Sequence, residues 1–149
     1  MKRPVTCVAL ALLLGVAVAQ LIQPNTGNPP VNSARNLWSD RRVDPRVAHI
    51  LRRACADCHS HETVWPWYSK ISPVSWFVAR HVSDGRAKLN FSDWSAASAD
   101  QLEEIYDSIV KNKMPLSSYL LIHPEARLSR ADRDALVAWA DGKLGPGSR

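Results

Sequence analysis

The pentapeptide Cys55-Ala56-Asp57-Cys58-His59 decides how the rest of this sequence is interpreted. Two cysteines that are separated by two residues and followed at once by a histidine form the C-x-x-C-H signature of covalent haem attachment. In that chemistry each thiol forms a thioether with a vinyl group of the porphyrin, and the adjacent imidazole is the proximal ligand of the iron. The motif therefore predicts haem c, with iron, held covalently by Cys55 and Cys58 and ligated by His59.

The same two cysteines have other possible meanings. A redox dithiol of the thioredoxin kind needs a βαβ setting, and no such pattern is visible. A zinc-bound structural module would use both thiols together with His59, His61 or His81. An exported chain can also carry a plain disulfide. The histidine directly after the second cysteine, together with an export signal, favours haem.

Residues 1–22 have the pattern of a signal peptide or an N-terminal membrane anchor. Lys2 and Arg3 give a positive start, an apolar run from Val5 to Ala19 follows, and Ala17-Val18-Ala19 has the A-x-A form of a cleavage site. The apolar stretch continues to Ile22, which is also long enough for a membrane-spanning segment. We expect a periplasmic protein, either soluble after cleavage or tethered to the inner membrane.

Cysteine usage and charge agree with this interpretation. Cleavage after Ala19 removes Cys7, so that the two thiols of the motif are the only ones left. The same cleavage removes two basic residues and lowers the formal net charge from +5 to +3. The basic excess is weak evidence for a nucleic-acid partner, and we expect none. A solvated surface explains the charges better.

The chain divides into a linker, one domain and a tail. Residues 23–43 are rich in proline and asparagine, which predicts an extended linker. Residues 44–144 show helical rather than alternating periodicity, which predicts an all-α domain. The motif adds one haem to that domain, and the resemblance described below implies that it is cytochrome c-like. Residues 145–149 are expected to be a flexible tail.

Helix boundaries follow from capping residues. Asp44-Pro45 suits the start of a helix that ends in the haem motif. A second helix is expected from Ser72-Pro73 to Asp84, with Gly85 as a left-handed stop. A third starts near Ser98. The last starts at Ser129 and ends at Gly142. The expected inner face of the second helix contains Val74, Phe77, Val78 and His81.

The segment Trp65-Pro66-Trp67-Tyr68 combines proline with clustered aromatic residues. This composition predicts an ordered loop that covers an apolar surface, such as a haem ring or the ordinary core. A backbone carbonyl between Thr63 and Pro73 is the expected hydrogen-bond acceptor for the second ring nitrogen of His59.

The sixth position of the iron has three candidate ligands. Met114 precedes Pro115, so it should lie on an extended strap that follows the third helix. A thioether is a soft, neutral ligand that raises the reduction potential. His81 and His123 are the alternatives, and ligation by two histidines gives a lower potential. Methionine also fills core space in many proteins.

Several blocks together resemble a known family. The C-x-x-C-H motif, Trp65 to Tyr68, His81, Gly85-Arg86 and Met114-Pro115 are similar to the haem-binding-domain family of small exported bacterial proteins. The resemblance extends to Asn28-Pro29-Pro30, Leu89-Asn90-Phe91, Trp94, Tyr119 and His123-Pro124. It implies a periplasmic or membrane-tethered haem protein, in some cases associated with peroxidase-type cytochromes. The more distant similarity to class I cytochromes c supports Met114 as the sixth ligand.

These observations favour a monohaem c-type cytochrome that transfers single electrons between exported redox partner proteins. We expect an electron carrier rather than a catalyst, because the cofactor supplies the redox chemistry. The main alternative is a haem enzyme or sensor, such as a peroxidase, whose sixth site is exchangeable or ligated by His81 or His123. A zinc-bound module is the least favoured.

Overall fold

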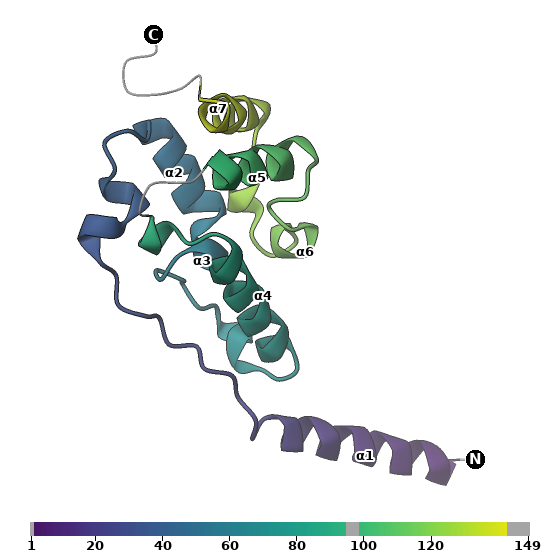
Figure 1. Ribbon diagram of the computed structural model, residues 1–149. Helices are drawn as coiled ribbons and strands as arrows, with labels where there is room; N and C mark the ends of the chain where they lie inside the picture. Colours follow the sequence, from purple (N-terminus) through teal and green to yellow (C-terminus); the bar gives the residue numbers. More distant parts are fainter. Residues whose placement is uncertain (1, 95–98, 143–149) are drawn as a thin grey trace.

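The computed structural model describes residues 2–94 and 99–142 of the chain, and the described part contains helices and no strands (Figure 1). The prediction of an all-α fold is therefore confirmed. The α-helices are α1 (Lys2–Ala19), α2 (Pro45–Ala54), α3 (Ala56–His59), α4 (Val74–Lys88), α5 (Ala99–Val110), α6 (Ser117–Leu120) and α7 (Arg130–Ala140). Short 3₁₀ helices are η1 (Ser33–Arg35), η2 (Leu37–Ser39), η3 (Trp67–Lys70), η4 (Phe91–Asp93) and η5 (Pro124–Ala126).

The first predicted cap is present, and it directs α2 toward the haem motif. The Asp44 side chain accepts a hydrogen bond from the Arg46 N–H at 2.7 Å, and Pro45 occupies the first helical position. The expected apolar face is the buried one: Val47, Ile50, Leu51 and Ala54. Because α3 follows α2 after the single residue Cys55, the motif continues from a helix that the core holds in place.

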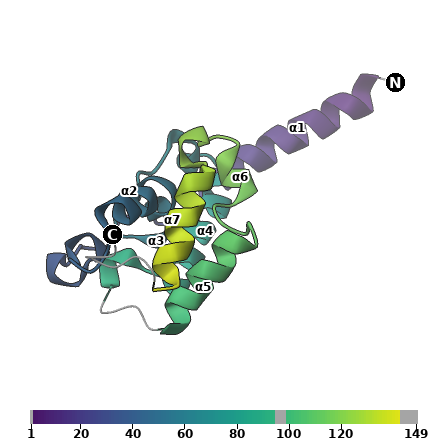
Figure 2. The ribbon, with the colours of Figure 1, turned by 90° about the horizontal axis from the view of Figure 1, so that it is seen from above.

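The core lies between α2, α5 and α7, and α5 and α7 lie side by side (Figure 2). The predicted capping box at Ser129 and Asp132 is present, and Gly142 follows the helix with a φ of 72°. Leu136 is fully buried, and Trp139 stacks on Trp94 with ring centroids 6.1 Å apart. The expected cap Ser98 and the expected tail 145–149 lie outside the described residues.

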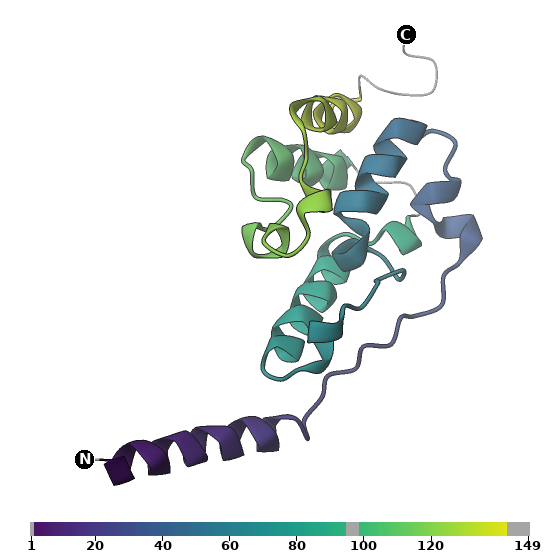
Figure 3. The same cartoon turned by 180° about the vertical axis from the view of Figure 1, so that it is seen from behind.

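The expected linker 23–43 differs from the structure in its second half. Residues 23–31 lack regular secondary structure and run toward η1 (Figure 3). From Asn32 onward the chain forms η1 and η2, and the Asn36 side chain caps η2 by accepting from the Trp38 N–H. Leu37 is completely buried and Val43 is 8% exposed, so this half contributes to the core. Asparagine is common in linkers and also at helix N-caps, and Asn32 and Asn36 have the second role here.

The second predicted helix has different bounds and a different buried face. α4 begins at Val74 and continues through Gly85 to Lys88, so Gly85 is an interior residue rather than the stop. Its fully enclosed side chains are Ser75 and Val82, whereas Val74 and Phe77 are 43% and 55% exposed. Ser75 packs inward because its hydroxyl is hydrogen-bonded to that of Ser72 at 3.0 Å.

The N-terminal helix α1 extends away from the remaining helices (Figure 1). Its apolar side chains from Val5 to Val18 are exposed. Within residues 2–94 and 99–142, no helix has the length and apolarity needed to cross a membrane.

The contribution of residues 32–43 to the core can be tested with Leu37→Ala. Because Leu37 is fully buried, we expect this substitution to lower the free energy of unfolding by about 2–5 kcal/mol in urea titrations. Val31→Ala, at a neighbouring residue that is 41% exposed, is the matched control and should change stability little. Equal, small effects of both substitutions would show that this segment does not contribute to the core.

Candidate functional site

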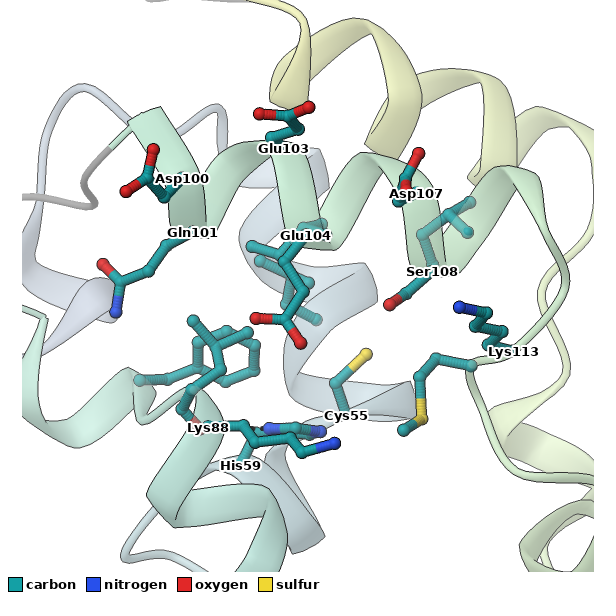
Figure 4. Close-up of a pocket in the computed structure, with 16 residues that line it drawn as sticks. Cys55, His59, Lys88, Asp100, Gln101, Glu103, Glu104, Asp107, Ser108 and Lys113 are labelled. Atoms are coloured by element: carbon teal, nitrogen blue, oxygen red, sulfur yellow. Dashed lines mark hydrogen bonds between the residues drawn. The ribbon is translucent and has the colours of Figure 1, made fainter.

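Two adjoining cavities lie beside the C-x-x-C-H motif, with volumes of about 470 Å³ and 240 Å³. Cys55, His59, Lys88 and Met114 line both cavities, so the two cavities meet at these side chains. Figure 4 shows Cys55 and His59 on one side of the larger cavity and α5, with Glu104 and Ser108, on the other. Apolar walls come from Leu51, Phe91, Ile105 and Ile109. Thiol, imidazole and thioether groups around an apolar space are a donor set that fits a haem.

His59 is held in one orientation by the end of α4. Its Nδ1–H donates to the carbonyl oxygen of Leu89 at 3.0 Å, which leaves Nε2 as the nitrogen available to a metal. The expected acceptor between Thr63 and Pro73 was therefore wrong, because α4 is longer than predicted and brings Leu89 to the ring. Burial lowers the pKa of His59, so the imidazole is neutral at physiological pH, as an iron ligand must be.

Gly85 permits the backbones of α3 and α4 to touch. A Cβ atom at this position would lie 2.5 Å from the carbonyl oxygen of Cys58 and 3.1 Å from its carbonyl carbon. Both are backbone atoms that cannot move aside as a flexible side chain can. The glycine thus serves close approach rather than a left-handed turn, and it places α4 directly behind the second cysteine.

Arg86, the next residue, fastens the loop that follows the motif. Its Nε donates to the Ser60 carbonyl at 2.7 Å, and its Nη2 donates to Thr63 Oγ1 at 2.8 Å and to Asn28 Oδ1 at 2.9 Å. Asn28 also accepts from the indole N–H of Trp65 at 3.0 Å. Asn28, which precedes η1, and Arg86 of α4 therefore hold residues 60–65 in place together.

Asp57, inside the motif, connects it to α6. Its Oδ2 accepts from the Tyr119 hydroxyl at 2.7 Å, and its Oδ1 accepts from the Val64 N–H at 2.9 Å. Burial, followed by the bond to Asp57, raises the pKa of Tyr119, so the phenol remains a donor. The two spacer residues of the motif are thus not equivalent: Ala56 is buried, and Asp57 ties the motif to two further segments.

The thiols themselves do not resemble an active dithiol. Burial raises the pKa of Cys55 to about 12 and that of Cys58 to about 11 in the cofactor-free chain, and no disulfide joins them. A redox dithiol requires the opposite shift. Among residues 2–94 and 99–142, no three or more His, Cys, Asp or Glu side chains are grouped so that they could hold a metal, which gives the zinc interpretation no support.

The three candidate sixth ligands have different surroundings. Met114 lines both cavities with His59, and His81 lines the smaller one. His123 lines neither. Its Nε2 accepts from the Tyr68 hydroxyl at 2.6 Å, and its Nδ1 pairs with Glu125 at 2.8 Å. Both ring nitrogens of His123 are thus hydrogen-bonded to other side chains. Ligation of the iron by Met114 stays a prediction.

The aromatic segment does not line either cavity. Trp67 is 75% exposed, and Tyr68 contacts His123 instead. Two cations that the sequence did not single out, Lys88 and Lys113, do line the larger cavity. Lys88 lies seven residues after His81 on the same face of α4. The helix predicted from the sequence ends at Gly85, so its pattern offers no reason to place Lys88 beside His81.

The contact between Gly85 and Cys58 predicts that Gly85→Ala changes stability in the opposite direction to an ordinary Gly→Ala substitution in a helix. In an ordinary helix interior, Gly→Ala stabilises by about 0.5–1 kcal/mol. We expect Gly85→Ala to destabilise the protein instead, by about 1–3 kcal/mol, because the new methyl group overlaps the Cys58 backbone. Thermal and urea unfolding measure this. Ser83→Ala, at an exposed position of the same helix, is the control, and a stabilised Gly85→Ala protein would contradict the close contact.

Comparison with known proteins identifies the family of this chain. The haem-binding-domain family matches residues 14–142, which is most of the chain and includes every residue that lines the two cavities. Searches among curated proteins and among solved structures gave no match. The chain belongs to the haem-binding-domain family, and haem is its cofactor.

Proposed function

We propose that this protein is a monohaem c-type cytochrome that carries single electrons between exported redox proteins. Cys55 and Cys58 would hold the haem as thioethers, His59 would be the proximal ligand and Met114 the sixth ligand. The single observation that carries the proposal is that these four side chains all line the cavity of about 240 Å³ beside α3.

The surroundings of the motif support covalent attachment and electron transfer. The contacts of Gly85, Arg86 and Asp57 fix α3, which carries Cys58 and His59, and the loop that follows it. A rigid loop and an oriented, neutral imidazole suit a carrier, because ligands that hold their positions in both oxidation states lower the cost of accepting an electron. When bound, the haem supplies the one-electron chemistry. The protein supplies the ligands, the apolar walls and the cations Lys88 and Lys113, which can pair with the propionates.

Export to the periplasm is part of this proposal. Lys2 and Arg3, the apolar stretch of α1 and Ala17-Val18-Ala19 support it.

A second candidate function is a haem enzyme or sensor with an exchangeable or His81-ligated sixth site. One observation favours it: His81 lines the smaller cavity together with His59 and Met114. Its Nδ1–H donates to the Phe77 carbonyl at 2.8 Å, which leaves Nε2 as the possible ligand.

Covalent attachment can be tested by mass. The protein matured in an exporting host should carry the mass of one haem, and this mass should survive denaturation because thioethers do not dissociate. The double substitution Cys55→Ser, Cys58→Ser should remove it completely. Cys7→Ser is the matched control, because Cys7 lies in α1 away from the site. A wild-type protein with the bare polypeptide mass would refute the proposal.

The sixth ligand can be tested by absorption spectra of paired variants. Met114→Ala should abolish the near-infrared sulfur-to-iron band, open the reduced iron to carbon monoxide and lower the reduction potential, because the soft thioether is lost. His81→Ala should leave all three properties unchanged. The reverse result, with His81→Ala changing the spectrum and Met114→Ala silent, would transfer ligation to His81.

A further inference from the structure

A group of exposed apolar side chains lies around the start of α4. It consists of Val64, Trp67, Val74, Trp76, Phe77 and Ile122, hereafter the apolar tip, and these side chains are between 39% and 75% exposed. Val64, Val74, Phe77 and Ile122 together border an apolar pocket of about 130 Å³. Clustered exposure of this kind, unlike scattered single residues, marks a surface that another apolar phase covers.

The apolar tip results from how α4 packs. Its inner face is made by the small or short residues Ser75, Val82 and Gly85, which face η3 and α3. Val74 and the larger Phe77 lie on the outer side of α4, where they are 43% and 55% exposed. The protein thus buries the Ser75 hydroxyl and exposes the Phe77 ring within the same part of α4. This arrangement costs stability in water. It is favourable when another apolar phase covers the ring.

The C-terminal end of the apolar helix α1 lies beside the apolar tip. The Gln20 side chain forms two hydrogen bonds with the backbone of Ser72, at 2.9 and 3.0 Å, and the indole N–H of Trp76 donates to the Ile22 carbonyl at 2.6 Å. These contacts place the end of α1 against the beginning of α4, and α1 then leads away from the domain (Figures 1 and 3). The side chains of α1 from Val5 to Val18 are exposed and, apart from Thr6, polar groups are absent from them, so this helix offers a further apolar surface next to the start of α4.

The charge pattern of the apolar tip fits a lipid surface as well. Residues 63–79 contain one charged side chain, Lys70, and no acidic one. Tryptophan is enriched at the boundary between lipid headgroups and acyl chains, where its ring is apolar and its N–H is satisfied. Trp76 has that arrangement, because its N–H is already bound to Ile22.

We propose that the apolar tip rests on the surface of a phospholipid bilayer, with Trp67, Trp76 and Phe77 at the level of the headgroups. Ile122 and the pocket beside it contact acyl carbons. The surface belongs to the folded domain, so it acts whether or not α1 is removed. The inference does not depend on electron transfer, and it concerns the outer rim of a pocket whose inner end is lined by Cys58 and His81.

The test is photochemical labelling from lipid. The full, haem-loaded chain is mixed with vesicles of phosphatidylcholine and phosphatidylglycerol that carry a diazirine near the glycerol end of an acyl chain. After illumination, lipid adducts are located by peptide mass spectrometry. We expect adducts in residues 64–78 and 116–123 in addition to any in α1. Adducts confined to α1, or spread evenly over the domain, would overturn the proposal.

Matched variants separate lipid contact from misfolding. Trp67→Ser, Phe77→Ser should reduce labelling of residues 64–78 severalfold, because both side chains are exposed and their loss leaves the core intact. Val110→Ser, at an equally exposed apolar position on α5, should not. An unchanged visible spectrum shows that each variant is folded. A dimeric mass of the haem-loaded chain in solution, together with the absence of lipid adducts from residues 64–78 and 116–123, would assign the surface to self-association and overturn the proposal.

Discussion

The backbone contact between α3 and α4 is the constraint on which the rest of the site depends. It exists because position 85 has no side chain, and it aligns the last turn of α4 with the motif. Arg86 then reaches Ser60 and Thr63, and the Leu89 carbonyl reaches the His59 ring. A single interhelical distance therefore controls the loop geometry, the orientation of the imidazole and the position of Lys88 at the cavity.

Local chemistry made much of the fold predictable. The N-cap at Asp44 and the capping box at Ser129 act within four residues, so they can be read without knowledge of what lies across the core. The face of α4 could not be read in this way. A periodicity argument assigns Val74 and Phe77 to the interior, but the neighbours that α4 meets, the Ser72 hydroxyl and the Cys58 backbone, favour small residues.

The site shows the same division. The motif itself was evident from the order of its residues, and a family match over residues 14–142 agrees with it. The residues that hold the motif and the loop after it range from 28 to 119 and meet only in the folded structure. Asn28 was assigned to a linker by its composition, yet it accepts hydrogen bonds from both Arg86 and Trp65. The residues around Asn28 do not indicate a hydrogen bond with Arg86, which is nearly sixty positions later in the sequence.

The order of segments along the chain has a consequence for assembly. Every element that closes the cavity over the motif, namely α4, α5 and the segment around Met114, follows Cys58 in the sequence. A chain that crosses a membrane with its N-terminus first would present both thiols while these later helices are still inside. The high thiol pKa values that burial creates would not yet exist at that stage. The fold would thus close around a group already in place, and no opening large enough to admit a porphyrin afterwards is needed.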